Sequence, residues 1–377
     1  MKLFKKILFI LPLAGLLFTS CSKWTDAELK EIDHIGGFNT MDNEKSEAYY
    51  KDLRAWKKTA ENYGRPVSFG WFSNWAPSGV VRKGYLSAVP DSIDIISMWS
   101  GAPGRYEITE AQKKDKEFVQ KKKGIKLLEV SLLSHLGKGR TPKSVYEEVE
   151  KQAEEEGWSD SKLNLARKHA RWDFWGFTSH DLKNKEELEA ALAKFAKALC
   201  DSLYTNDWDG FDIDWEPGIG FNDADGTLDN STFRFLVKEM GKYIGPKSDP
   251  EGKGHKLLCI DGLIDGDKFE ELDEYVDYWI RQWYGNPSPD FSTPGNRPEK
   301  LIITENFESY ATWGGYLLNQ AAAMPSEGYK GGVGAYRFDN DYSNSPDYKW
   351  MRQAIQINQE VFNKWKAEQG QEDSENL

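Results

Sequence analysis

The chain has few of the residues from which disulfide frameworks, metal centres and nucleic-acid surfaces are built. Its 377 residues include 3 cysteines and 5 histidines, and no Cys/His cluster has metal-site spacing. Cys200 and Cys259 lie in apolar sequence, which favours buried free thiols over a disulfide. The net charge of −12 argues against nucleic acid or anionic lipid as the main partner. We therefore expect no metal, no cofactor and no nucleic-acid partner.

The apolar run near the N-terminus, at residues 7–18, is too short to span a bilayer comfortably. It follows a basic start and precedes small residues and Cys21. This pattern resembles a bacterial lipoprotein signal peptide over residues 1–20, with Cys21 as the lipidated first residue of the mature chain. Phe18 departs from the leucine that such signals usually carry. An ordinary cleaved secretion signal is the alternative.

Composition and pattern divide the rest of the chain into three parts. Residues 21–42 are polar and are expected to form a tether with little fixed structure. Residues 43–368 carry the periodic apolar pattern of a folded domain. The tail at residues 369–377 is expected to be disordered.

Residues 209–217 carry the clearest chemical signal. Asp212, Asp214 and Glu216 recur at every second position, with large apolar residues between them. Because a strand has a side-chain period of two, one face would carry only acids and the other only apolar groups. Acids so close together cannot all ionise freely, which is a means of keeping one protonated as a general acid. The alternative is an edge strand whose acids face water.

Strands and helices alternate along the folded part. Apolar runs predict strands at residues 66–71, 93–99, 125–133, 210–216, 256–263, 278–284, 301–306 and 332–338. Helical patterns occur at residues 43–63, 109–122, 184–203, 230–244, 313–323 and 348–368. Most strands are followed by a helix, which predicts one α/β domain, a parallel (β/α)8 TIM barrel. A long insertion with two helical pieces, at residues 134–182, follows the third strand.

Residues 209–216 match the DxxDxDxE signature of glycoside hydrolase family 18 at all four acidic positions and on the expected fourth strand. Beyond this motif the resemblance is one of strand order, over roughly residues 65–366. That family contains chitinases and endo-β-N-acetylglucosaminidases on a barrel of this kind. The resemblance therefore implies a glycosidase.

The resemblance also implies a substrate-assisted reaction with net retention. Glu216 would protonate the glycosidic oxygen and later take a proton from water. Asp214 would hydrogen-bond the acetamide N–H and stabilise the oxazolinium ion that forms when the acetamide carbonyl attacks the anomeric carbon. Asp212 would lie deeper in the barrel and support Asp214. Asp209, which has the opposite strand parity, is expected to be structural.

The strand expected at residues 278–284 agrees with this interpretation. Gln282 and Tyr284 share one parity, so both should face the lumen, where the tyrosine hydroxyl can donate to the acetamide oxygen. The Gln-x-Tyr arrangement resembles endo-β-N-acetylglucosaminidases that act on N-glycans, whereas chitinases more often carry Met-x-Tyr-Asp there. Residues 129–134 also lack the Ser-x-Gly-Gly pattern common in chitinases. The last two strands leave no room between them for the extra α+β subdomain of many chitinases.

Aromatic residues make up 14% of the chain, and such rings either stack on sugars or fill a large core. The family often has a tryptophan at the end of the last strand as the floor of the −1 subsite, and here Tyr336 is the candidate. Other sugar contacts are expected near the ends of the strands, where loops set specificity. The candidates are Trp71, Trp99, Trp283 and Asn286.

We expect an endo-β-N-acetylglucosaminidase that cleaves the N,N'-diacetylchitobiose core of N-glycans on glycoproteins and acts as a monomer. A chitinase or chito-oligosaccharidase and a non-catalytic glycan-binding lipoprotein are the alternatives. A lipid anchor at Cys21 would suit a glycan-foraging bacterium and would hold the chain on the outer membrane, at the cell surface. A periplasmic or secreted protein is the alternative.

Overall fold

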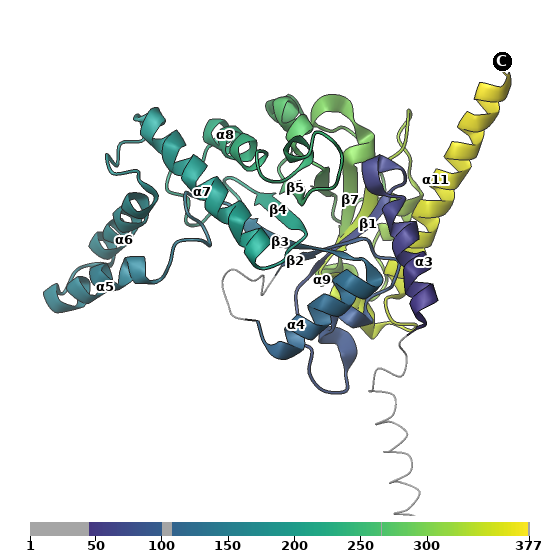
Figure 1. The fold of residues 1–377 in the computed structure, drawn as a ribbon, viewed down its shortest axis with the longest axis horizontal. Coiled ribbons are helices and arrows are strands. Elements are labelled where there is room, and N and C mark those ends of the chain that lie inside the picture. The colour runs from purple at the N-terminus through teal and green to yellow at the C-terminus, as the bar shows by residue number, and fades with distance from the viewer. Residues whose placement is uncertain (1–44, 100–107, 265, 376–377) are drawn as a thin grey trace, which may run out of the picture. The chain divides into compact units, whose positions relative to one another are not determined.

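Each strand of this chain lies between the lumen of a barrel and an outer layer. The computed structural model describes residues 45–99, 108–264 and 266–375 (Figure 1). Within these ranges eight parallel strands close into a barrel in chain order, and the last strand pairs with the first. The predicted (β/α)8 barrel is confirmed. The predicted signal peptide, the tether and Cys21 lie outside the described residues.

The strands lie within two residues of their predicted ends: β1 (Val67–Phe72), β2 (Ile95–Met98), β3 (Lys126–Leu132), β4 (Gly210–Trp215), β5 (Leu257–Gly262), β6 (Tyr278–Gln282), β7 (Leu301–Asn306) and β8 (Gly332–Tyr336). The helices are α3 (Glu47–Lys58), α4 (Glu110–Glu117), α5 (Ser144–Glu156), α6 (Asp160–Trp175), α7 (Lys185–Thr205), α8 (Asn230–Met240), α9 (Phe307–Tyr310), α10 (Leu317–Ala322) and α11 (Lys349–Glu375). A 3₁₀ segment, η7 (Gly266–Tyr275), replaces a helix between β5 and β6.

Strand β4 shows why the acidic face is turned inward. Phe211, Ile213 and Trp215 are fully or almost fully buried and belong to the apolar layer between barrel and helices. The Trp215 ring stacks on Phe233 of α8, with ring centroids 3.8 Å apart. Because β4 is paired with both β3 and β5, it is not an edge strand. The residues of opposite parity must therefore point into the lumen.

The barrel closes where β1 and β8 approach each other closely. A Cβ atom added at Gly334 would lie 2.2 Å from the carbonyl oxygen of Phe69 on β1. One added at Gly70 would lie 2.4 Å from the ring of Phe338, just after β8. Glycine is therefore needed on both strands of this seam, because any larger residue would push the strands apart.

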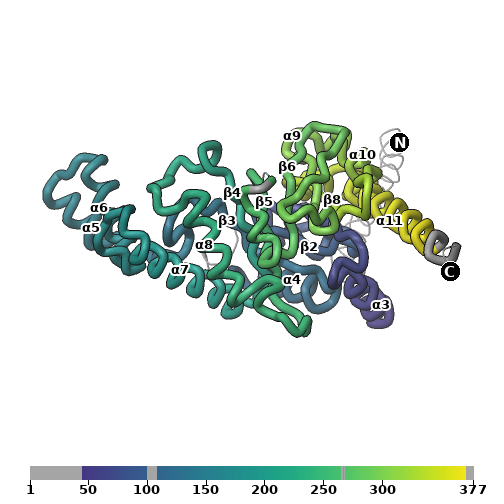
Figure 2. Tube along the Cα trace, turned by 90° about the horizontal axis from the view of Figure 1, so that it is seen from above, coloured from purple at the N-terminus to yellow at the C-terminus, as the bar shows by residue number. Residues whose placement is uncertain are grey.

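The insertion after β3 folds as an antiparallel pair of helices. Figure 1 and Figure 2 both show α5 and α6 side by side, and Arg167 of α6 pairs with Glu150 of α5 at 2.7 Å. Ser159 caps α6 by accepting from the backbone N–H of Lys162. Asn184 caps α7 by accepting from the backbone N–H of Glu187. The two helical pieces predicted within residues 134–182 are confirmed.

The last helix is longer than predicted. α11 runs to Glu375, past residue 368 where the sequence pattern predicted its end. Gly370 does not end the helix, because glutamate and glutamine around it are strong helix formers and no proline follows. From Lys51 onward the chain forms one compact unit, with no division near residue 180. No helix in the described ranges is both long and apolar enough to cross a bilayer.

Both internal cysteines are buried and unpaired, as predicted. Burial raises the pKa of the Cys200 thiol to about 12 and that of Cys259 well above its ordinary value. Both side chains therefore act as small apolar groups, Cys200 among the outer helices and Cys259 in the lumen.

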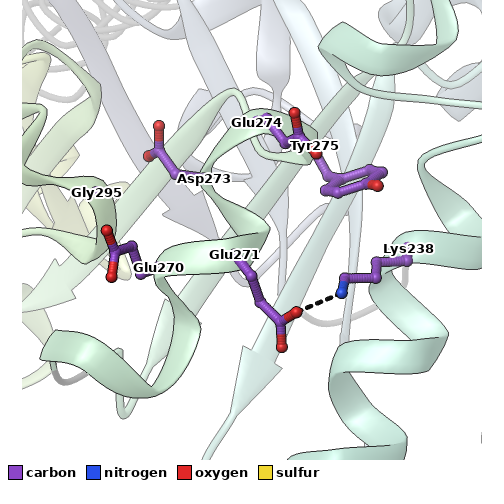
Figure 3. Close-up of a pocket in the computed structure, with 7 residues that line it drawn as sticks. All are labelled: Lys238, Glu270, Glu271, Asp273, Glu274, Tyr275 and Gly295. Atoms are coloured by element: carbon purple, nitrogen blue, oxygen red, sulfur yellow. Dashed lines mark hydrogen bonds and ion pairs between the residues drawn. The ribbon is translucent and has the colours of Figure 1, made fainter.

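A cavity of about 660 Å³ lies beside η7, before the start of β6 (Figure 3). Its lining is mostly acidic and consists of Lys238, Glu270, Glu271, Asp273, Glu274, Tyr275 and Gly295. Lys238 pairs with Glu271 across it. The cavity is at the N-terminal ends of the strands, whereas catalytic groups of such barrels lie at the C-terminal ends.

Candidate active site

Strand β4 brings the three acids of the motif to the lumen and its rim. Asp212 and Asp214 are 0% and 1% exposed, and Glu216 follows the last residue of the strand and is half-buried. The two aspartates are thus inside the barrel, and the glutamate is at its C-terminal mouth. Asp209 has a structural place, because its carboxylate accepts from Gln120 at 2.7 Å and from the backbone N–H of Leu127 at 2.9 Å.

The deepest acid, Asp212, is held by two neutral donors. Trp71 Nε1 and Ser97 Oγ both donate to Asp212 Oδ2, at 3.0 and 2.7 Å. Trp71 is 1% exposed, so the predicted sugar contact is corrected: the indole is a support for Asp212. Ser97 was missed from the sequence. Its place between Ile96 and Met98, on the lumen parity of β2, could have indicated it.

A further carboxylate, Asp261 of β5, was also missed. It is fully buried and lies in register with Asp214. Gln282 Nε2 donates to Asp261 Oδ1 at 2.7 Å, so the side chain of Gln282 is engaged with a protein group. The alternation of residues 257–262 places Cys259 and Asp261 on one face. This alternation could have indicated that Asp261 faces the lumen, but it does not indicate that Asp261 lies next to Asp214.

The buried aspartates are difficult to ionise. Burial raises the pKa of Asp212 to about 6, against hydrogen bonds from Ser97 and Trp71 that lower it. Burial and the charges of Glu216 and Asp212 raise the pKa of Asp214 to about 8. Burial and the charges of Asp214 and Asp212 raise the pKa of Asp261 well above its ordinary value. Among the described residues, no cation contributes to these three shifts.

Aromatic rings form one wall of the site. Tyr336 at the end of β8 contacts the rings of Tyr284, Trp99 and Trp71, with ring centroids 6.2, 5.5 and 6.2 Å away. Tyr284, Tyr336 and Trp99 are partly exposed. Burial and the charges of Asp261 and Asp214 raise the pKa of Tyr284 well above its ordinary value, so its hydroxyl remains a donor. The structure thus brings together three of the predicted contact residues.

The side chains of two other predicted sugar contacts, Trp283 and Asn286, bond to the loop that carries them. Trp283 has the opposite parity to Gln282; its ring packs against the outer layer, and Nε1 donates to the Ser288 carbonyl at 2.9 Å. Asn286 Oδ1 accepts from the backbone N–H of Ser288 at 3.0 Å. Gln320 Nε2 donates to both main-chain carbonyls, at 2.9 and 3.1 Å. These contacts hold the loop after β6 in place, and sugar contact by the half-buried Trp283 and the exposed Asn286 stays a prediction.

An exposed aromatic group, not expected from the sequence, follows β7. Trp313 is 50% exposed and packs edge-on against Tyr310 and Tyr316, at 5.5 and 5.8 Å. The buried carboxylate of Glu305 accepts from the backbone N–H groups of Gly285 and Tyr316, both at 2.8 Å. It therefore ties the loop after β6 to the segment that carries Trp313. Sequence periodicity placed Trp313 only at the start of a helix.

The family model of glycoside hydrolase family 18, BT1044-like, matches residues 25–172 and 166–357. The chain belongs to glycoside hydrolase family 18. It is therefore a glycoside hydrolase, and β4 carries the acids of the family 18 signature. No curated protein matches this family 18 chain.

Solved structures agree with the fold of this family 18 enzyme. BT1044, solved as a selenomethionine-labelled Glu→Gln variant, is 27% identical with a TM-score of 0.63, over 86% of this chain and 96% of that one. An endo-β-N-acetylglucosaminidase from Cordyceps militaris is 18% identical with a TM-score of 0.57, over 84% and 97%. It was solved with fucosyl-N-acetylglucosamine-Asn, as a variant in which an aspartate and a glutamate two positions apart are replaced by their amides.

The raised pKa values predict how stability depends on pH. The native state keeps protons on the lumen aspartates that the unfolded chain releases near pH 4, so native stability falls as pH rises from about 4 to about 8. Asp214→Asn removes one of these groups. We expect the decline in unfolding free energy between pH 5 and 8 to shrink, by an amount on the order of a few kcal/mol.

Urea unfolding at several pH values measures this effect. Asp52→Asn, on the exposed side of α3, is the matched control and should leave the decline unchanged. An identical decline in Asp214→Asn and the wild-type chain would contradict the assignment of a raised pKa to Asp214.

Proposed function

We propose that this family 18 enzyme is an endo-β-N-acetylglucosaminidase that hydrolyses the N,N'-diacetylchitobiose core of N-glycans. The observation that carries the proposal is the placement of Glu216 and Tyr284 at the mouth of the barrel, around buried aspartates. Burial is the main cause of the raised pKa of Tyr284, and the negative charges of Asp261, Asp214 and Glu216 raise it further. These side chains therefore lie close enough to interact. A sugar ring held against Tyr336 would then lie between an acid and a phenol.

In the first step, the protonated Glu216 carboxyl donates to the glycosidic oxygen as the bond from that oxygen to the anomeric carbon breaks. The carbonyl oxygen of the substrate's own acetamide forms a bond to the anomeric carbon and gives an oxazolinium ion. Asp214 accepts a hydrogen bond from the acetamide N–H and stabilises the positive charge of the oxazolinium ion. The Tyr284 hydroxyl donates to the acetamide oxygen before attack and orients it.

In the second step, water attacks the anomeric carbon from the face that the leaving sugar vacated. Glu216, now a carboxylate, takes a proton from that water, and the bond between acetamide oxygen and anomeric carbon breaks. The acetamide is restored and the configuration is retained. The sum of both steps is the addition of one water molecule across the glycosidic bond.

Three features of the chain and one solved neighbour favour an N-glycan over chitin. β6 carries Gln282 and Tyr284 in place of a Met-x-Tyr-Asp sequence. Residues 307–331 contain α9 and α10 and no strand, so the extra α+β subdomain of many chitinases is absent between β7 and β8. Trp313, held beside the loop after β6, offers an exposed ring on which a branch of a glycan can stack. The Cordyceps militaris neighbour binds a sugar attached to asparagine.

We propose further that Cys21 is lipidated and anchors the enzyme to the bacterial outer membrane, at the cell surface. The basic start, the short apolar run and the small residues before Cys21 support this. The full chain expressed in a bacterium should partition into detergent, and Cys21→Ser should remain in the aqueous phase. Equal partitioning of both would contradict the anchor.

A glycoprotein and chitin oligomers, offered in parallel, test the proposed substrate. We expect a free glycan ending in N-acetylglucosamine from the glycoprotein, one sugar left on asparagine, and little cleavage of chitin oligomers. Mass spectrometry of both products measures this. Release of chitobiose alone would favour a chitinase, and binding without any release would favour a glycan-binding protein.

Glu216→Gln tests the assignment of the acid. Glutamine keeps the shape of the side chain but has no proton to donate, so we expect normal folding, retained substrate binding and a fall in kcat of about 10²-fold or more. Glu186→Gln, exposed in the first turn of α7, is the matched control and should keep the wild-type rate. A wild-type rate in Glu216→Gln would remove Glu216 from its role.

A further inference from the structure

Asp261 belongs to the site, yet no step of the proposed reaction uses it directly. It lies on β5 in register with Asp214, so the two Cα atoms are about 4.8 Å apart on neighbouring strands. Leu258 and Ile260 of the same strand belong to the outer layer. The alternation of β5 therefore fixes Asp261 on the lumen side, beside the aspartates of β4.

One oxygen of each lumen aspartate lacks a donor. Asp261 Oδ1 accepts from Gln282 Nε2, but Asp261 Oδ2 is buried and has no hydrogen-bond partner within the described part of the chain. The same holds for Asp212 Oδ1 and Asp214 Oδ1. Because a carboxylate only accepts, three ionised side chains cannot satisfy one another. A proton held between two of them satisfies both oxygens at once.

Asp261 is best suited to hold that proton. Asp212 Oδ2 accepts from two donors, which favour its charged form, and the proposed reaction needs a charged Asp214, so the proton falls to Asp261, which accepts from one donor. After burial, hydrogen bonding to Asp261 lowers the pKa of Asp212 and of Asp214, while the bond with Asp212 raises that of Asp261. Since Gln282 occupies Oδ1, the proton lies on Oδ2.

We propose that Asp261 is a positioning residue, a neutral carboxylic acid that donates its Oδ2–H to the aspartates of β4 and keeps the negative charge on them. Once Asp214 has lost its own proton, its negative charge is held where the acetamide N–H binds and the oxazolinium ion forms. Gln282 acts through Asp261, because its amide fixes Oδ1 as an acceptor. This role rests on the proposed function and adds to it a proton-holding group on β5.

The groups that face Asp261 come from three strands: Asp212 and Asp214 of β4 with Glu216 beyond, Cys259 of β5, and Gln282 and Tyr284 of β6. Burial raises the pKa of the Cys259 thiol and of the Tyr284 phenol well above their ordinary values. Both therefore stay protonated near neutral pH. The carboxyl groups of Asp212, Asp214 and Asp261 are the members of this set whose raised pKa values lead them to exchange protons.

Asp261→Asn and Asp261→Leu, made in the full chain, separate a neutral donor from other roles. Asparagine offers an N–H in place of the acid O–H and keeps an oxygen for Gln282, whereas leucine has a similar shape and neither group. We expect Asp261→Asn to keep most of the wild-type kcat. We expect Asp261→Leu to lose about 10²-fold in kcat with a much smaller change in KM.

The pH profile of kcat adds a readout that a packing role would not change. The proposed reaction needs a protonated Glu216, whose ionisation also sets an alkaline limb. An amide at Asp261 cannot ionise, so the alkaline limb of Asp261→Asn should lie at the same pH as that of the wild-type chain or higher. A kcat of Asp261→Asn about 10²-fold below that of the wild-type chain, or an alkaline limb that moves to lower pH, would overturn the proposal. The asparagine variant decides the question even if Asp261→Leu does not fold.

Proton release on unfolding tests the same role without activity. At neutral pH the native wild-type chain holds a proton on Asp261 that the unfolded chain releases, so Asp261→Asn should release one proton fewer. The slope of unfolding free energy against pH measures this, with Asp52→Asn as control. Equal slopes overturn the role of Asp261. If the slopes differ as expected but the chain cleaves no N-acetylglucosamine linkage, the proposed function is wrong. The assignment of a proton to Asp261 is then still supported.

Discussion

The site depends on burying carboxylates in the barrel with no cation beside them among the described residues. An isolated buried charge is costly, and a protein commonly avoids it by neutralising the group. Asp212, Asp214 and Asp261 are all at most 1% exposed, and their pKa values are raised by burial before any other cause. Protons must therefore be shared among them. The position of each proton decides which aspartate is charged when substrate binds.

The rest of the barrel keeps this arrangement in register. Phe211, Ile213 and Trp215 are buried against the helices, so a shift of β4 by one residue would put these rings in the lumen and the acids in the apolar layer. Pairing with β5 on one side places Asp214 against Asp261. The apolar outer face thus supplies the stability that makes an acidic inner face tolerable.

The mouth of the barrel is built differently from its lumen. Glu216, Tyr336 and Trp99 are partly exposed, and the buried carboxylate of Glu305 holds the loop after β6 and the segment after β7. Some residues that look like sugar contacts therefore serve the loops, as Trp283 and Asn286 do. Others, such as Trp313, become available because their neighbours hold them outward.

The sequence by itself determined the barrel, the strands and the inward face of β4, because period-two alternation and apolar runs are local properties that survive folding. It also placed Glu216 at the end of its strand and Tyr284 on the lumen parity of β6. Only the tertiary structure decided that Trp71 and Ser97 support Asp212, that Gln282 binds Asp261, and that Trp283 packs outward. These contacts join strands far apart in the chain, and which side chains meet is set by the register between strands, a quantity that no single strand's pattern contains.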